Sequence, residues 1–185
     1  MELKMSELAW IASARKHIGL KEIAGSNHNK NIVTWLKEMP KYSKAVKAWW
    51  ANDEMAWCGT FVGAMLGQNG RYVVPNWFRA KDWGDSTTMT RLSKPAYGCL
   101  VVFGRQGGGH VGFVVGQDDK GRLMVLGGNQ SNAVNIMAFD KSRVLGYYWP
   151  SIWDGSKAVK SVPAENRYVL PKFNSKGVVL STNEA

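Results

Sequence analysis

The sequence is poor in cysteine, with only Cys58 and Cys99 among 185 residues. A disulfide scaffold needs more cysteines than this, although two thiols could form one bond. The cysteines and the three histidines are scattered, and no ligand spacing such as CxxC or HExxH is present. The sequence therefore predicts no metal site and no cofactor. We interpret the chain as made in a reducing cytoplasm, where thiols stay free.

Long hydrophobic runs are also missing. No stretch approaches the roughly 20 apolar residues of a membrane-spanning helix, and the N-terminus lacks the continuous apolar core of a secretory signal. We therefore expect no transmembrane segment and no signal peptide. The length is sufficient for one domain with its own core, which we place at residues 1–150. Residues 151–185 are expected to be a C-terminal extension, either a hairpin or a loose tail.

Acidic residues are outnumbered, with 14 Asp and Glu against 24 Lys and Arg, which gives a net charge of +10. Such an excess favours anionic partners, which include nucleic acid, membrane surfaces and cell-wall polymers. No nucleic-acid motif accompanies the charge, so we expect no nucleic-acid partner. The lysines of the N-terminal third could equally be a solvated helix face.

Helical and strand patterns separate along the chain. Apolar residues at helical spacing predict helices over residues 6–18, 29–39, 42–50, 56–68 and 75–83. Ser6 and Asn29 are the predicted N-caps, and Pro40 is predicted to end the second helix. Short runs rich in Val, Ile and aromatic residues predict strands over residues 99–103, 110–117, 122–126, 132–139 and 144–149. Helices that precede an antiparallel sheet indicate an α+β fold.

Cys58 begins the third clear helix, at a position where a thiol can become a nucleophile. The partial positive charge and unpaired N–H groups of a helix N-terminus lower the pKa of a thiol. His110 lies at the mouth of a predicted strand and can take the thiol proton. The glycines before it, Gly109 included, leave this mouth open to a substrate.

A third polar residue is expected beside His110. The sequence Asp118-Asp119-Lys120-Gly121 predicts a hairpin turn. Pairing about that turn sets Gln117 opposite Arg122, which brings His110 close to Asn129. A slip of one residue selects Gln130 instead. A thiol, an imidazole and a carboxamide in this order indicate a hydrolase with a cysteine nucleophile.

Each of these residues also has a structural interpretation. A lone buried cysteine is usually an inert small hydrophobe, and we expect this of Cys99, which lies within an apolar strand. Trp57, Gly109 and Gln130 are candidate substrate contacts. Trp57, Trp77 and Trp83 can line a cleft, but core packing is the stronger interpretation for each.

Four runs carry a resemblance to a known family, and they are Trp57-Cys58-Gly59-Thr60-Phe61-Val62, Pro95-Ala96-Tyr97-Gly98-Cys99-Leu100-Val101-Val102-Phe103, Gly109-His110-Val111-Gly112-Phe113-Val114-Val115-Gly116 and Leu126-Gly127-Gly128-Asn129-Gln130-Ser131-Asn132-Ala133-Val134. Over roughly residues 5–150 the chain resembles the NlpC/P60 and CHAP superfamily. Within it, the chain is most similar to small phage-associated cell-wall peptidases.

The resemblance implies a papain-like α+β fold, with N-terminal helices packed on a five- to six-stranded antiparallel sheet. It also implies cleavage of amide bonds in peptidoglycan, with Cys58 as the nucleophile, His110 as the base and Asn129 as the third polar residue. The chain departs from its relatives at Cys99, where they commonly carry an acidic residue.

A phage endolysin is the expected role. Such a protein is made in the host cytoplasm, is released by a holin and acts as a monomer on the anionic envelope in the periplasm or cell wall. Three alternatives stay open. They are an amidase toxin delivered by a secretion system, a non-catalytic wall-binding module and an acyltransferase.

Overall fold

The computed structural model describes residues 6–24, 27–43, 56–105, 107–176 and 180–181. Its helices are α1 (Ala9–Arg15), α2 (Lys30–Tyr42) and α3 (Cys58–Gly67), with short 3-10 turns η1 (Ala80–Gly84), η2 (Lys141–Arg143) and η3 (Glu165–Tyr168). Its strands are β1 (Thr90–Leu92), β2 (Leu100–Arg105), β3 (Gly108–Asp118), β4 (Leu123–Gly127), β5 (Asn135–Phe139), β6 (Val144–Trp149), β7 (Ile152–Trp153), β8 (Ala158–Val159) and β9 (Lys172–Phe173).

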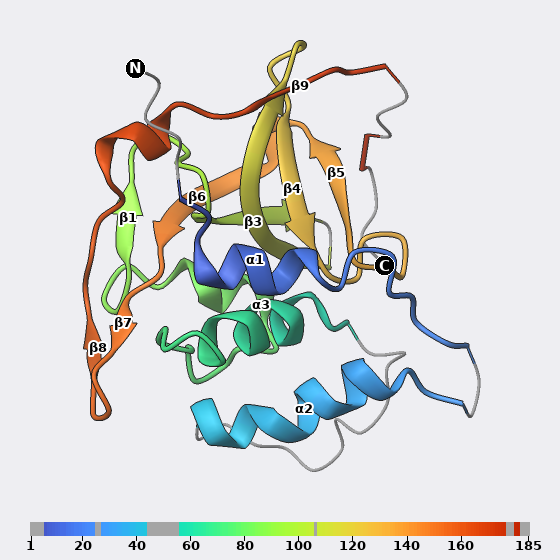
Figure 1. Ribbon diagram of the computed structural model, residues 1–185, viewed down its shortest axis with the longest axis vertical. Coiled ribbons are helices and arrows are strands. Elements are labelled where there is room, and N and C mark those ends of the chain that lie inside the picture. The colour runs from blue at the N-terminus through green and yellow to red at the C-terminus, as the bar shows by residue number, and fades with distance from the viewer. Residues whose placement is uncertain (1–5, 25–26, 44–55, 106, 177–179, 182–185) are drawn as a thin grey trace.

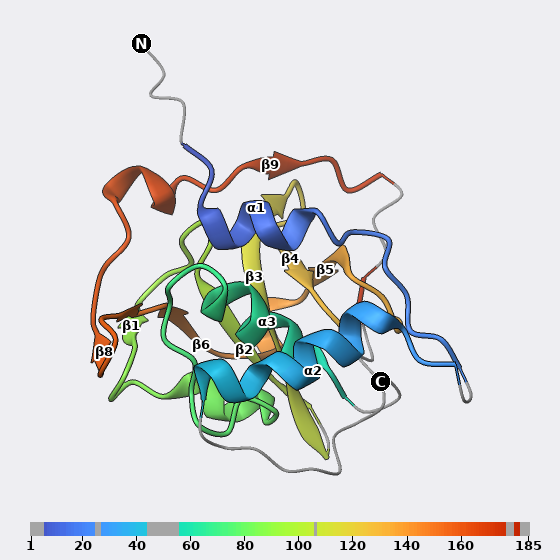
Figure 2. The ribbon, with the colours of Figure 1, turned by 60° about the horizontal axis from the view of Figure 1, so that its bottom comes forward.

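The helices form layers on one side of a curved sheet (Figure 1). The innermost helix is α3, which packs against β3, and α2 packs against α3 on its outer side (Figures 1 and 2). Residues 58–66 of α3 are all buried, as expected for a helix that is apolar all round. The ring centroids of Phe61 on α3 and Phe113 on β3 are 6.5 Å apart, which places the core between this helix and the sheet. The predicted α+β fold is therefore confirmed.

The main sheet is larger than predicted. Six strands pair in the antiparallel order β1-β6-β2-β3-β4-β5, and β9 joins as a seventh strand, parallel to β3. The sequence pattern missed β1 because only three residues of a polar segment form it. It also missed β9, because a two-residue strand leaves no visible alternation.

The hairpin between β3 and β4 is confirmed at the predicted turn. Gly121 has φ +80°, which favours glycine, and its N–H donates to the carbonyl of Asp118. The Asp118 carboxylate accepts from the backbone N–H of Lys120 and of Arg122, and Arg122 Nε lies 2.6 Å from it. A buried carboxylate with these donors fixes where the two strands turn.

Several helix boundaries differ from the prediction, and the helix predicted over residues 75–83 is found only as the 3-10 turn η1. Pro40 lies inside α2, which continues to Tyr42, and the N–H of Ser43 still donates to the carbonyl of Met39. Proline removes only one helical hydrogen bond, and near the end of a helix this loss is tolerated. Ser6 does not cap α1, whose N-cap is Leu8. The predicted basic helix over residues 42–50 lies largely outside the described residues.

The C-terminal residues pack back onto the domain. β7 and β8 pair as a small hairpin, from which the chain runs up the same side of the view to η3, and β9 then crosses the top of the molecule, where it pairs with β3 (Figure 1). The tail hairpin suggested by the sequence would pair residues 168–170 with 178–180, and of these Tyr168 is the last residue of η3. Residues 177–179 lie outside the described part. The division of the chain at residue 150 stays a prediction.

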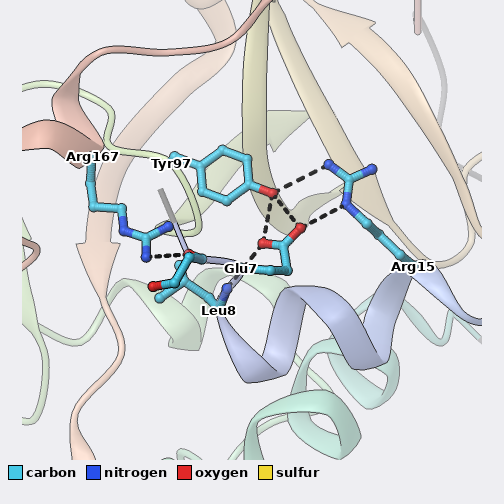
Figure 3. A network of polar contacts seen from close by, with 6 residues as sticks. Glu7, Leu8, Arg15, Tyr97 and Arg167 are labelled. Atoms are coloured by element: carbon cyan, nitrogen blue, oxygen red, sulfur yellow. Dashed lines mark hydrogen bonds and ion pairs between the residues drawn. The ribbon is translucent and has the colours of Figure 1, made fainter. Parts of the chain in front are cut away.

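A polar network fastens the segment around Glu7 and the segment around Arg167 to the turn before β2 (Figure 3). The Tyr97 hydroxyl contacts both oxygens of the Glu7 carboxylate at 2.8 and 2.9 Å, and Arg15 Nε lies 3.3 Å from Glu7 Oε2. Arg167 donates to the carbonyl of Ser6, and its own carbonyl accepts from the Tyr97 N–H. Segments 161 residues apart are thereby joined. Among the described helices, none is long and apolar enough to span a bilayer.

Candidate active site

Cys58 is the first residue of α3, and its residue surface is only 5% exposed. Burial has the largest effect on the pKa of its thiol and leaves that pKa above its usual value. The backbone N–H groups of Val111 and Gly59 and the positive charge of Arg105 act in the opposite direction and lower that pKa. These contacts stabilise the thiolate, because each places positive charge beside the sulfur. The thiol therefore lies against β3, at the residue that follows His110.

The His110 side chain is fully buried on β3 among aromatic rings. Its imidazole is parallel to the Phe139 ring within 4°, at 5.4 Å between centroids, and it also stacks with Phe103 at 6.3 Å. The Arg143 guanidinium lies 5.9 Å from the centroids of both phenyl rings. Stacking on these rings fixes the plane of the imidazole. Which ring nitrogen carries the proton is then decided by the hydrogen bonds of the imidazole.

Gln130 makes that selection. Its Oε1 lies 3.0 Å from His110 Nε2. Its amide Nε2 donates to the carbonyl of Val125 and to both the carbonyl and Oδ1 of Asn135. Because these partners are all acceptors, the amide group must present its oxygen to the imidazole. His110 Nε2 is then the donor, and in the neutral ring the basic lone pair belongs to Nδ1.

Asn135 completes this chain of hydrogen bonds, and the sequence analysis did not identify it. Its Nδ2 donates to the backbone carbonyl of Gln130 at 2.8 Å, while its Oδ1 accepts from the Gln130 side chain at 2.8 Å. The two carboxamides therefore hold each other in one orientation. No signal in the sequence pointed to this residue, because it lies five positions beyond Gln130 on a different element, at the start of β5.

Asn129 was the preferred third residue, but the described hydrogen bond of His110 Nε2 goes to Gln130. As expected from the turn, Phe113 pairs with Leu126. Nearer the turn an irregularity shifts the pairing by one residue, so Gln117 pairs with Leu123 and not with Arg122. However, β4 ends at Gly127, so the ladder does not continue to residue 129. The chain turns there with positive φ at Asn129, Ser131 and Asn132. This turn, and not the strand register, decides which carboxamide reaches the imidazole.

Two glycines allow the backbone to approach the site closely. A Cβ on Gly127 would lie 2.5 Å from Gln130 Oε1, so a side chain at this position would displace the carboxamide. A Cβ on Gly109, a predicted substrate contact, would lie 2.8 Å from the Phe103 carbonyl oxygen and 3.0 Å from Lys81 Cγ. Gly109 is therefore needed for packing of β3 against β2 and η1.

The tryptophan predicted to contact substrate is part of the core. Trp57 is 1% exposed, and its Nε1 donates to Glu22 Oε2 at 3.1 Å. The indole is therefore packed in the core of the structure, and a contact of Trp57 with substrate stays a prediction. Trp77 and Trp83 are also buried, which agrees with the core interpretation.

The two cysteines have different surroundings. Cys99 is fully buried, and burial raises the pKa of its thiol to about 12. It is a core residue, as expected. Within the described residues, no three His, Cys, Asp or Glu side chains gather closely enough to hold a metal ion. Arg105, which lowers the Cys58 pKa, is a further functional candidate that the sequence analysis missed.

Comparison with known proteins gives one family match. Residues 50–129 match the family model of the CHAP domain. The match contains both Cys58 and His110 and ends at Asn129, one residue before Gln130. No curated protein and no solved structure matches the chain.

Proposed function

We propose, from the premise that residues 50–129 form a CHAP domain, that this protein hydrolyses amide bonds of peptidoglycan with Cys58 as its nucleophile. CHAP domains are generally cysteine- and histidine-dependent amidases or peptidases that act on peptidoglycan. One observation carries the proposal. The thiol at the start of α3 lies against the backbone next to His110, whose tautomer is set by Gln130.

In the first step, His110 Nδ1 accepts the proton of the Cys58 thiol and the sulfur attacks the amide carbonyl. The carbonyl oxygen of the tetrahedral intermediate becomes negatively charged. Backbone N–H groups at the start of α3 are suited to stabilise it, because they carry the positive end of the helix dipole. His110 then gives the proton to the leaving amine, which departs as the C–N bond breaks and a thioester remains.

In the second step, water hydrolyses the thioester. His110 Nδ1 takes a proton from water, hydroxide adds to the thioester carbonyl, and the carboxylic acid is released as the proton returns to the Cys58 sulfur. The Nε2–H bond to Gln130 lasts through both steps and stabilises the imidazolium that forms between them. The charge of Arg105 favours the thiolate in the same interval.

The biological role that we propose is that of a phage endolysin. The net charge of +10 suits an anionic cell envelope. In this role the protein is made in the host cytoplasm, a holin releases it, and it cleaves stem-peptide amides of the cell wall as a monomer. Turbidity loss of permeabilised cells is the corresponding measurement.

Digestion of purified sacculi tests the chemistry. The wild type is expected to release soluble fragments whose masses identify the bond that is cut, whereas Cys58→Ala releases none. Cys99→Ala is the matched control, because it removes a buried thiol that accepts from the backbone N–H of Ala96. Undiminished release by Cys58→Ala would overturn the proposal. Binding of the wild type to sacculi without any release would favour a non-catalytic wall-binding module.

A further inference from the structure

A cavity that Cys58 does not line lies between the C-terminal end of α2 and the hairpin formed by β7 and β8. Its volume is about 630 Å³. Figure 1 shows this hairpin as a projection at the edge of the molecule, on the side where α2 ends. None of the residues that line the cavity belongs to the His110–Gln130–Asn135 chain or to α3. The cavity therefore needs an explanation of its own.

An exposed tryptophan forms part of the cavity wall. Trp153 is 42% exposed, whereas every other tryptophan that the structure describes is less than 5% exposed. The Trp153 ring lies beside that of Tyr72, with centroids 5.9 Å apart and planes tilted by 32°. Leaving a large apolar ring in water is unfavourable, so its exposure at a cavity indicates a binding surface. Two neighbouring rings of this kind present a flat platform, on which the apolar face of a sugar ring can stack.

The remaining lining supplies hydrogen-bond donors and positive charge. Lys41 and Lys157 both line the cavity, together with the hydroxyl-bearing Ser156 and Tyr42; the exposed Lys41 ammonium also pairs with Glu38 Oε1 at 3.4 Å, outside the lining. No acidic side chain is among its described lining residues. The carboxylate of Asp154, on the same hairpin, accepts from the backbone N–H groups of residues 156 and 157. The cavity therefore suits a ligand that combines sugar rings, carbonyl oxygens and negative charge.

We propose that this cavity binds the glycan strand of peptidoglycan. The amino sugars stack on Trp153 and Tyr72. The ammonium groups of Lys41 and Lys157 donate to the acetamido carbonyls and to carboxylates carried along the same polymer. The site holds the strand while Cys58 cleaves the attached peptides. This inference takes its ligand from the proposed function, but glycan binding is measured without hydrolysis.

Binding experiments test the site directly. The probes are N-acetylglucosamine tetramer, measured by titration calorimetry, and sacculus glycan strands stripped of peptides, measured by co-sedimentation. With Cys58→Ala as the parent protein, Trp153→Ala is expected to weaken binding of both probes by about tenfold, the value of one aromatic contact. Ile152→Ala is the matched control, because Ile152 is 43% exposed on the same hairpin but does not line the cavity.

A second pair of variants tests the charge. Lys157→Gln is expected to weaken binding of stripped strands several-fold. Its control is Lys160→Gln, because Lys160 lies outside the cavity with its Nζ bonded to the carbonyl of Ser86. Equal binding by Trp153→Ala and its control would overturn the inference. So would binding of free stem peptides, but not of glycan, in a manner that depends on Trp153.

The two proposals fail in distinguishable ways. If the wild type releases nothing from sacculi while glycan binding still depends on Trp153, the glycan site stands and the proposed hydrolysis is wrong. If sacculi are digested and Trp153→Ala digests them and binds glycan as well as Ile152→Ala does, the hydrolysis stands and the glycan site is wrong.

Discussion

Two hydrogen-bonded clusters of this molecule differ in charge and in exposure. They are the His110 cluster (His110, Gln130 and Asn135) and the Tyr97 cluster (Glu7, Arg15, Tyr97 and Arg167). The His110 cluster joins an imidazole to two carboxamides, and its first two members are fully buried. The Tyr97 cluster contains charged groups, and the side chains of Arg15 and Glu7 are 36% and 39% exposed. The first cluster therefore decides where one proton resides, while the second holds segments of chain together.

A cysteine lies near each cluster, and the same contrast applies to the two thiols. Cys58 lies at a helix N-terminus, where backbone N–H groups and Arg105 oppose the effect of burial on its pKa. Cys99 lies at the turn that contains Tyr97, where its sulfur accepts from the N–H of Ala96 and burial raises its pKa to about 12. Burial also raises the pKa of Cys58, but there Arg105 adds an opposing charge that Cys99 lacks among its described neighbours. Burial alone makes a thiol inert. A buried thiol gains reactivity only when positive charge is placed beside it.

The largest expected effect is the loss of catalytic rate in Gln130→Ala, compared with the neighbouring variant Asn129→Ala. Gln130→Ala removes the acceptor for His110 Nε2–H, so we expect kcat/KM to fall by about 100-fold, within the range typical of general acid–base catalysis. Asn129→Ala is the matched control, with a change below about threefold, because its carboxamide makes no described hydrogen bond to His110. Sacculus digestion measures both. A larger loss for Asn129→Ala than for Gln130→Ala would restore Asn129 as the third catalytic residue.

The pH–rate profile tests whether Gln130 acts by fixing the tautomer of His110. In Gln130→Ala, the Nε2–H bond that stabilises the imidazolium is lost. Because His110 must be neutral to accept the Cys58 proton, the acidic limb of the pH–rate profile is expected to move to lower pH, while the melting temperature of Asn129→Ala stays near that of the wild type. A loss of rate with no change in the pH profile would indicate a purely structural role for Gln130.

The next effect concerns Cys99 and the pH dependence of stability. Its thiol stays protonated in the folded protein to about pH 12, whereas an unfolded thiol loses its proton near pH 8.5. The unfolded state therefore binds fewer protons above this pH, and the free energy of unfolding falls as pH rises. One such group contributes about 1.4 kcal/mol per pH unit. Urea unfolding between pH 9 and 11 should give a flatter slope for Cys99→Ala than for the wild type.

Equal slopes for the two proteins would mean that Cys99 titrates in the folded state. The contrast between the two thiols would then be lost. Because Lys, Tyr and Cys58 titrate in both proteins, their contributions cancel in the difference between slopes. The comparison needs no assumption about the absolute stability of either protein.

The smallest expected effect is that of Glu7→Gln in the Tyr97 cluster. Both Glu7 and Arg15 are more than one third exposed, so solvent screens their ion pair. We expect a loss of about 0.5 kcal/mol in the free energy of unfolding, measured by urea denaturation, and no change in sacculus digestion. A clear loss of activity without a loss of stability would show that the Tyr97 cluster also acts on the catalytic site.

Local patterns in the sequence were sufficient for several features. The apolar run after Trp57 identified α3 and placed Cys58 at its start, and the turn before Gly121 identified the β3–β4 hairpin. Each of these features depends on residues adjacent along the chain. The two short strands β1 and β9 were missed because their pairing is determined by distant segments.

The polar partners within the site were less predictable. Strand register predicted that Asn129 would face His110. The expected pairing is found at Val125 and Leu126, but nearer the turn the strands are shifted by one residue. Register could not show that the chain turns after Gly127 or that Asn135 orients Gln130. It also could not show that Arg105 acts on Cys58 from β2. These relations join different elements, so they exist only once the sheet has formed.

The sequence by itself determined which groups are chemically available, namely a thiol at a helix start, an imidazole on a strand and two carboxamides after the next strand. Only the tertiary structure decided which carboxamide binds the imidazole and which tryptophan stays in water. The physical reason is that residue type and short-range periodicity are local properties. Hydrogen-bond geometry and burial are set by contacts between residues that are distant along the chain.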